Sequence, residues 1–391
     1  MSQAGLALCA GLDCATNVPF LLRVIDRPAA SPEDGKGIFN RLRALFVGWV
    51  WRHSMVRQLS KRGAIALLLC AFLPRHGHAA PNNPALAIQV SLDRAGFSPG
   101  VIDGTLGRLT REAIKGFQEA KDIAVTGEVD AETKAALGDP GAATETVEVT
   151  DAGPFQPPIP EDPAEQAKLD KLGYTSMEEA LAERYHTTPA FLRRLNPGSH
   201  FAVGDQIMVP AVAVAGTGAG AGTATGAAVP AGTATGANEW DATLEKLSVA
   251  PSQPAAAKVV VDKSDKNVRV FDSAGKLLAL FPATIGSAHD PLPLGTWKIR
   301  GVAKLPSFHY NPDLFWDASA KDSKATLPPG PNSPVGVVWI DLSKEHYGIH
   351  GTPEPAMIGR TTSHGCIRLT NWDAAKLAQM VRPGTPAILQ E

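Results

Sequence analysis

The most informative part of this 391-residue sequence is Ser363-His364-Gly365-Cys366-Ile367-Arg368-Leu369, and His350-Gly351-Thr352 begins sixteen positions before its cysteine. The pattern predicts a nucleophilic cysteine with a histidine base, because a free thiol needs a proton acceptor to become the reactive thiolate. In an extended segment the side chain of His364, two residues before Cys366, points to the same side of the chain. The residues alone therefore leave His350 and His364 as nearly equal candidates for the base.

The N-terminal part of the sequence predicts export. A basic stretch begins at Met55, an apolar run follows over residues 63–73, and small residues lead to Ala79-Ala80. These are the three parts of a secretory signal, and the apolar run is shorter than the about 20 residues of a membrane span. We predict a signal peptide over residues 55–80, an untranslated or unstructured extension over residues 1–54, and a periplasmic protein with no membrane span after cleavage.

If the protein is exported, cleavage of the signal peptide would remove three of its four cysteines. Cys9, Cys14 and Cys70 all lie before the predicted cleavage site. The mature protein would keep Cys366 as its one thiol, with no internal disulfide partner. Its polar setting between glycine and histidine argues against an inert buried residue.

Composition predicts several small domains and no nucleic-acid partner. A net charge of −2 gives no reason to expect nucleic-acid binding, and about 310 mature residues exceed one ordinary domain. Residues 139–163 are rich in proline, threonine and acidic residues, and residues 213–256 are mostly Ala, Gly, Thr and Pro. Both stretches are expected to be linkers, the second a flexible tether that would let one domain hold another near many partners.

Residues 85–138 predict a small helical domain. Three amphipathic patterns run over residues 85–95, over residues 110–121, and from the expected N-cap Asp130 to Leu137. With the turn Asp103-Gly104-Thr105-Leu106-Gly107 before the second pattern, this segment resembles the three-helix peptidoglycan-binding module over its whole length. The resemblance implies contact with peptidoglycan.

Residues 165–212 predict two helices followed by a strand. Ser176 and Glu179 have the spacing of a capping box, Pro189 suits the first turn of a second helix, and residues 201–210 alternate like a strand. The order resembles a LysM-like βααβ glycan-binding module. Its usual opening strand is degraded around residues 171–176, which leaves a packing or spacer role almost as well supported as glycan binding.

Residues 257–391 predict a mainly β domain with one helix near its end. Short β-rich runs cover residues 259–261, 267–271 and 277–281, and further strands are expected over residues 295–302, 337–342, 347–350 and 386–389. One helix is expected from about Trp372 to Met380, with Asn371 as its cap. The complete chain is therefore predicted to be multidomain α+β.

The last domain resembles an L,D-transpeptidase catalytic domain, which is sandwich-like. The matching residues include His350-Gly351-Thr352, Ile358-Gly359 and the stretch around Cys366. The resemblance implies that Cys366 is the nucleophile and favours His350 over His364 as the base. The amides of Gly365 and Cys366 are candidates for oxyanion stabilisation.

Three neighbouring residues are expected to support substrate binding. Arg368, two residues beyond Cys366, is expected to face the same site and could hold a substrate carboxylate, or could form an internal salt bridge that fixes the loop. Ser363 is expected to position His350 through its backbone carbonyl, and Gly351 is expected to shape the loop behind the base. The proline-rich stretch over residues 304–334, with Phe308, Tyr310, Phe315 and Trp316, suggests a lid beside the site.

The expected activity is cysteine acyl transfer without metal or cofactor. The resemblance implies that Cys366 takes a tetrapeptide stem, releases D-alanine, and passes the acyl group to the amine of a second stem. Water as acceptor would make a carboxypeptidase, and an outer-membrane lipoprotein would make an anchoring enzyme. A non-catalytic peptidoglycan-binding scaffold is the rival class, and a zinc site built from Cys366, His350 and His364 is a third hypothesis.

Overall fold

The computed structural model describes residues 83–139, 141–150, 153–212, 236–319 and 321–391. The chain divides into two units, Met1–His76 and Gly77–Glu391, and every described residue belongs to the second. The predicted extension over residues 1–54 and the predicted signal peptide over residues 55–80 lie outside the described residues. Within the described ranges, no helix has the length and apolar character needed to cross a membrane.

The C-terminal domain is built on a nine-stranded sheet with the order β5-β4-β3-β13-β7-β10-β11-β12-β6. The long strand β7 joins its two halves: residues 295–298 pair with β13, and residues 299–304 pair with β10. The strands of this sheet are β3 (Lys258–Asp262), β4 (Asn267–Phe271), β5 (Leu277–Pro282), β6 (Thr284–Ile285), β7 (Gly295–Lys304), β10 (Val338–Leu342), β11 (Gly348–His350), β12 (Ile367–Arg368) and β13 (Pro386–Gln390). The mainly β domain predicted over residues 257–391 is confirmed.

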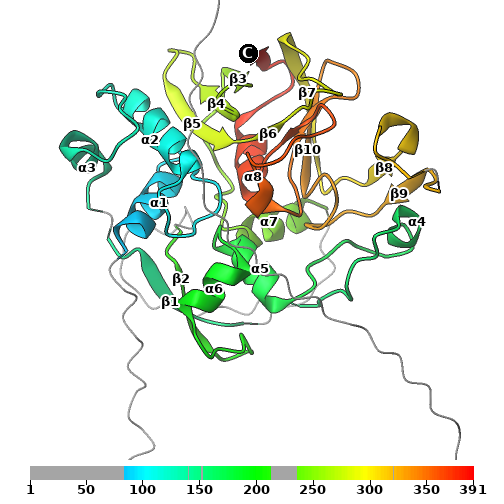
Figure 1. Ribbon diagram of the computed structural model, residues 1–391, viewed down its shortest axis with the longest axis horizontal. Coiled ribbons are helices and arrows are strands. Elements are labelled where there is room, and N and C mark those ends of the chain that lie inside the picture. The colour runs from blue at the N-terminus through cyan, green and yellow to red at the C-terminus, as the bar shows by residue number, and fades with distance from the viewer. Residues whose placement is uncertain (1–82, 140, 151–152, 213–235, 320) are drawn as a thin grey trace, which may run out of the picture. The chain divides into compact units, whose positions relative to one another are not determined.

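One helix supports the sheet near the predicted active-site stretch. Helix α8 (Asn371–Met380) begins directly after that stretch and packs against β10 and β11 (Figure 1). Its N-cap is Thr370, whose hydroxyl accepts from the amide of Asp373, so the prediction of Asn371 as cap was wrong by one residue. Asn371 is thereby freed for the interactions described below.

Part of the predicted linker over residues 213–256 is helical. Helix α7 (Gly236–Lys246) places Trp240 and Leu244 in the main core of the C-terminal domain, and Leu247 and Val249 follow them. Burial of these side chains stabilises the fold by about 25 cal/mol for each Å² of apolar surface removed from water. The tether prediction was therefore wrong over residues 236–249, while residues 213–235 lie outside the described residues.

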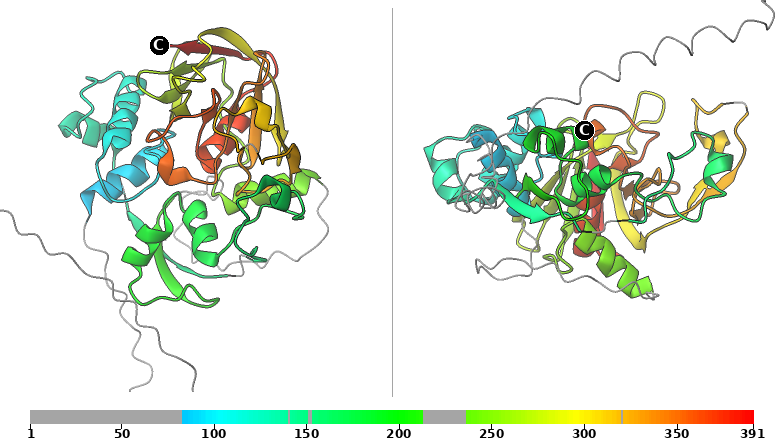
Figure 2. Two further views of the ribbon diagram at one scale, coloured as in Figure 1. Left: turned by 45° about the vertical axis from the view of Figure 1, so that its right-hand side comes forward. Right: turned by 90° about the horizontal axis from the view of Figure 1, so that it is seen from below.

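The three-helix module follows the prediction closely. Its helices are α1 (Pro84–Arg94), α2 (Arg108–Ala120) and α3 (Ala131–Leu137), and Asp130 caps α3 by accepting from the amide of Thr133. In Figures 1 and 2, α2 lies beside β5. Phe97 and Phe117 of the module share a buried cluster with Leu277 and Leu280 of β5. This module is docked on the C-terminal domain through an apolar core.

The middle module differs from the prediction in where its first strand lies. Strand β1 (Thr144–Glu148), inside the predicted linker 139–163, pairs antiparallel with β2 (Gln206–Pro210). The helices between them are α4 (Pro163–Gln166), α5 (Met177–Arg184) and α6 (Pro189–Leu195). The two main helices and the closing strand were predicted. The opening strand comes from residues 144–148, and the degraded stretch near residues 171–176 forms no strand.

Capping at α5 differs slightly from the predicted reciprocal pair. The Ser176 hydroxyl accepts from the amide of Glu179, as expected, but the Glu179 carboxylate accepts from the amide and hydroxyl of Thr175. The carboxylate thus stabilises the residue before the cap. The chain enters α5 in a fixed direction.

A buried polar junction connects the three modules. The Asp93 carboxylate of α1 accepts from His186 at 3.0 Å and from Lys376 of α8 at 3.0 Å, and the His186 ring stacks on Trp372. Beside it, the hydroxyl of Ser98 donates to Asp373 at 2.8 Å. Buried ionisable groups that are hydrogen-bonded across modules fix one docking geometry, because each loses its partner if the modules separate.

This junction makes stability depend on pH. Burial raises the pKa of Asp373 from 3.8 to about 6. A raised carboxyl pKa adds stability below the unfolded value of 3.8, and that stability is lost as the pH rises through 6. Between pH 4 and 7 this carboxyl group should change the free energy of unfolding by about 3 kcal/mol, and Asp373→Asn should remove that change. Melting temperatures of both proteins across that range measure it, and parallel curves would contradict the assignment.

Candidate active site

Cys366 lies at the start of a strand that runs beside the strand of His350. Strands β11 and β12 are parallel, and their register pairs Ile349 with Ile367 and His350 with Arg368. Cys366 immediately precedes β12, is half-buried and, in the described ranges, is the one cysteine, with no disulfide. Its sulfur is 3.7 Å from the carbonyl of His346 and accepts a hydrogen bond from the amide of Gly348. The thiol therefore rests against the segment that leads into His350.

His350 is buried and held in one tautomer. Its Nδ1 donates to the carbonyl of Gly351 at 2.7 Å, and its ring stacks on Trp339 with centroids 5.3 Å apart. A carbonyl can only accept, so Nδ1 carries the proton and Nε2 holds the free lone pair of the neutral ring. The prediction that the Ser363 carbonyl positions His350 was wrong, because the carbonyl of Gly351 does so.

Ser363 stabilises the cysteine loop itself. Its hydroxyl donates to the carbonyl of Cys366 at 2.5 Å. Between them, Gly365 has a φ of +96°, and a side chain there would place its Cβ 2.7 Å from a ring carbon of Tyr347. Only glycine fits this backbone and this space. The loop before Cys366 is thus held by a local hydrogen bond and by close packing.

His364 faces the proline-rich segment. Its Nε2 is 2.7 Å from a carboxylate oxygen of Asp317, and its ring lies 4.9 Å from Phe315 and 5.8 Å from Trp316. The segment over residues 304–334 carries the hairpin of β8 (Phe308–Tyr310) and β9 (Ala325–Leu327), with a 3-10 turn, η1 (Pro312–Leu314), between them. A second 3-10 turn, η2 (Pro355–Met357), follows β11. His364 and His350 therefore have different partners.

Arg368 makes no hydrogen bond or salt bridge to any described residue. Its guanidinium is largely buried and interacts at longer range with Cys366, Glu354 and Asp317. The internal salt bridge considered for this side chain is therefore not formed among the described residues. A buried cation near the thiol, with its donors unused, is suited to an anionic ligand group.

Burial sets the protonation states of the two central groups. Burial, assisted by the charge of Arg368, lowers the pKa of His350 from 6.5 to about 3. Burial raises the pKa of the Cys366 thiol, against the opposing effects of the Gly348 amide and Arg368. Near neutral pH the resting pair is a neutral thiol and a neutral imidazole, and the imidazole is free to accept a proton.

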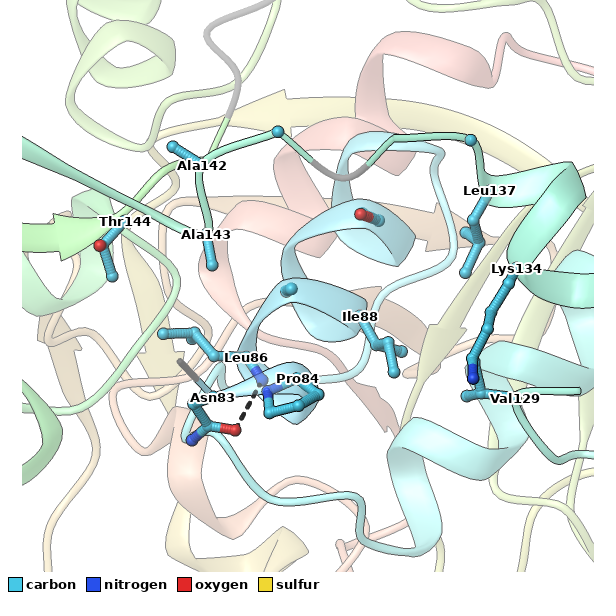
Figure 3. A pocket seen from close by; sticks show the side chains of 14 residues that line it. Asn83, Pro84, Leu86, Ile88, Val129, Lys134, Leu137, Ala142, Ala143 and Thr144 are labelled. Atoms are coloured by element: carbon cyan, nitrogen blue, oxygen red, sulfur yellow. Dashed lines mark hydrogen bonds between the residues drawn. The ribbon is translucent and has the colours of Figure 1, made fainter. Parts of the chain in front are cut away.

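A separate cavity of about 620 Å³ lies in the three-helix module. Figure 3 shows Leu86 and Ile88 of α1 on one side and Val129, Lys134 and Leu137 on the other. The lining is mainly apolar, and the hydroxyl of Ser91 at its wall has no hydrogen-bond partner within the described part of the chain. The cavity can accept a ligand with both apolar and polar parts.

The zinc hypothesis finds no support in ligand geometry. Among the described residues, no group of three or more His, Cys, Asp or Glu side chains is arranged to hold a metal ion. His364 is bound to Asp317, and Nδ1 of His350 is bound to a carbonyl. Asp317 and the Gly351 carbonyl were not identified from the sequence.

Two family models match the chain. An L,D-transpeptidase catalytic domain matches residues 256–389, and a "Putative peptidoglycan binding domain" matches residues 82–137. The "Putative L,D-transpeptidase YkuD" of Bacillus subtilis is 54% identical over 55 residues, which cover 14% of this chain and 34% of that protein. This chain spans about a third of the length of the first such relatives.

Longer matches have lower identity. A "Putative L,D-transpeptidase" of Fuscovulum blasticum is 32% identical over 127 residues, covering 32% of this chain and 66% of that protein. A solved L,D-transpeptidase from Mycobacterium smegmatis is 25% identical, with a TM-score of 0.28, and covers 34% of this chain and 58% of that one. The matches over residues 82–137 and 256–389 identify a peptidoglycan-binding domain followed by an enzymatic L,D-transpeptidase catalytic domain.

Proposed function

We propose that this protein is an exported, periplasmic L,D-transpeptidase that crosslinks peptidoglycan. The observation that carries the proposal is the pair of adjoining strands β11 and β12, which bring Cys366 beside the segment of a neutral, tautomer-fixed His350. The family matches supply the substrate class, since both domains belong to cell-wall chemistry.

The proposed reaction begins with attack by Cys366 on the carbonyl of the diamino acid residue in a tetrapeptide stem. As the carbon–sulfur bond forms, Nε2 of His350 takes the thiol proton. The tetrahedral intermediate then collapses, the bond to D-alanine breaks, and the imidazolium returns the proton to the leaving amine. The products of this half-reaction are a thioester on Cys366 and free D-alanine.

The second half-reaction transfers the acyl group. The side-chain amine of a second stem attacks the thioester, His350 accepts a proton from that amine, and the thiolate leaves and is reprotonated. Water in place of the amine would give a carboxypeptidase, and an amine of an outer-membrane lipoprotein would give an anchoring enzyme. The second stem is the acceptor of our proposal, and the experiment below distinguishes it from water.

Two features of the loop support stabilisation of charge during the reaction. The amides of Gly365 and Cys366 are our candidates for the oxyanion site, since the fixed backbone at Gly365 needs no reorganisation when charge develops. Arg368, which has no protein hydrogen-bond partner among the described residues, is our candidate for holding a substrate carboxylate. The hairpin segment with Phe315, Trp316 and Asp317 would cover the bound stem, with His364 as its contact to the loop.

The other domains would hold the enzyme at the wall. We propose the cavity between α1 and α3 as the place where the peptidoglycan-binding domain contacts its polymer (Figure 3). Glycan binding by the middle module remains our hypothesis from its βααβ order. Because these modules are docked on the catalytic domain, we expect the bound wall segment to lie at a set distance from Cys366.

Intact-protein mass spectrometry with a disaccharide-tetrapeptide tests the proposal. We expect a mass increase that peptide mapping assigns to Cys366, together with released D-alanine and a crosslinked dimer. Free tripeptide without dimer would identify water as the acceptor. A folded protein that gives neither adduct nor product would contradict the enzymatic proposal and favour a binding scaffold.

A further inference from the structure

We propose that Glu183, which lies outside the catalytic domain, is a positioning residue for His350. The inference rests on the proposed function of the Cys366 and His350 pair. Glu183 belongs to α5 of the middle module, and its side chain reaches the catalytic domain next to the backbone that holds the histidine. The middle module thereby becomes part of the catalytic unit.

The carboxyl group of Glu183 is buried, and each of its two oxygens accepts a hydrogen bond. Glu183 is 5% exposed; one carboxylate oxygen accepts from Nδ2 of Asn371 at 2.7 Å, and the other accepts from the hydroxyl of Tyr174 at 2.7 Å. A buried carboxyl group costs free energy unless both oxygens are satisfied. The matched pair of donors indicates that this acidic side chain belongs in the interface.

Asn371 transmits the contact to the catalytic backbone. Its Nδ2 donates to Glu183 and to the carbonyl of Pro331, and its Oδ1 accepts from the amide of Val337. The side chain is fully buried. These bonds define which end of the amide is oxygen and which is nitrogen, because donors and acceptors on the two sides are not interchangeable.

The amide oxygen of Asn371 packs directly against the support of the base. A Cβ added at Gly351 would lie 2.1 Å from that oxygen, and one added at Gly336 would lie 2.0 Å from it. The carbonyl of Gly351 is the acceptor for Nδ1 of His350. The order of contacts is therefore Glu183, Asn371, Gly351 and His350, each in van der Waals or hydrogen-bond contact with the next.

Neighbouring contacts from the same module fix this arrangement. The amide of Asn332 donates to the carbonyl of Leu172, and its side chain donates to Gly173 and Glu179. The amide of Leu172 donates to the carbonyl of Pro329. The middle module is therefore hydrogen-bonded to residues 329–332. Within that stretch, the carbonyl of Pro331 accepts from Asn371. Loss of Glu183 would leave a donor of Asn371 unpaired and loosen the backbone at Gly351.

The test compares Glu183→Ala with Glu183→Gln. The glutamine oxygen can still accept from Asn371, while the hydroxyl of Tyr174 can turn to accept from the new amide, so Glu183→Gln should retain activity within about threefold. Glu183→Ala removes the acceptor. We expect Glu183→Ala to lower acyl transfer at least tenfold, mainly through kcat, because the base is misplaced and substrate contacts are retained.

The deciding readout is the rate of Cys366 alkylation by iodoacetamide from pH 5 to 10, which needs no stem peptide. With His350 misplaced, the thiol loses its proton acceptor, so the alkylation rate of Glu183→Ala at pH 7 should fall about tenfold. Ser98→Ala is the matched control, because it removes another buried intermodule hydrogen bond to α8. It should lower the melting temperature and leave the alkylation profile unchanged.

The outcomes separate positioning from general stability. An unchanged alkylation rate in folded Glu183→Ala, or a loss of rate no greater than that of Ser98→Ala, would overturn the positioning role. Should Glu183→Ala fail to fold, Glu183→Asp decides by the same readout, since the shorter side chain keeps a carboxyl group but withdraws its oxygen from Asn371. Inactivity of the unaltered enzyme toward the tetrapeptide, with normal alkylation, would instead count against the proposed function.

Discussion

Cys366→Ala is expected to form no acyl-enzyme and to release no D-alanine, because no other thiol occurs among the described residues. His350→Ala should retain the nucleophile and lose its proton acceptor, which lowers the rate of D-alanine release by about 10² to 10⁴ at pH 7. Both variants should fold, because the Cys366 thiol makes weak sulfur hydrogen bonds to the segment His346–Gly348 and the His350 ring bonds the adjacent Gly351 carbonyl. D-alanine release in a coupled assay and intact mass measure the two effects.

His364→Ala is the matched control for the base. Its Nε2 is bound to Asp317 of the hairpin segment, so its loss should loosen that segment and reduce the rate less than tenfold. A larger loss in His364→Ala than in His350→Ala would reverse the assignment of the base. Burial lowers the pKa of His350 to about 3, so this base stays unprotonated between pH 7 and 5. Protonation of His350 should therefore not lower the rate in that range.

The sequence predicted those features that depend on local patterns. The three helices of the first module, the Asp130 cap and the strands on either side of the active-site stretch were confirmed within a few residues. Caps and amphipathic periods are encoded within a few positions of the element that they stop or start. The match to the catalytic family was also local, since its residues lie in short stretches.

Contacts between distant segments could not be predicted in this way. Strand β1 has an alternating sequence too short to stand out, and it becomes a strand only by pairing with β2. Helix α7 did leave a signal: Trp240, Leu244 and Leu247 are spaced at four and three residues, but the surrounding Ala, Gly and Thr hid it.

In the site, too, local sequence predicts some features and contacts between distant segments determine others. The residue types of Cys366 and His350 follow from the chemistry, whereas the acceptor for Nδ1 is a backbone carbonyl, which any residue at position 351 would carry. The side chain that fixes this region, Glu183, is distant in sequence and lies in another module. A capping pattern explains why a helix begins near it, but nothing local predicts that its carboxylate reaches Asn371.

Gly336→Ala should lower the free energy of unfolding strongly, although it adds only one methyl group. Gly336 has a φ of +61°, and a Cβ there would lie 2.0 Å from Oδ1 of Asn371 and 2.8 Å from the Gly351 backbone. Asn371 cannot move aside, because it is fully buried and bound to Glu183, Pro331 and Val337. The left-handed backbone and the overlap together should cost about 4 kcal/mol or more.

Gly275→Ala separates the two contributions in this prediction. Gly275 has a φ of +82° with no atom within 4 Å of an added Cβ, so its substitution carries the backbone cost alone, about 1 to 2 kcal/mol. Urea unfolding of both variants measures the difference, and alkylation of Cys366 in any folded Gly336→Ala reports whether the overlap displaces Gly351. Equal destabilisation of the two variants would mean that the space around Asn371 can relax, and the rigid support inferred for His350 would then have to be abandoned.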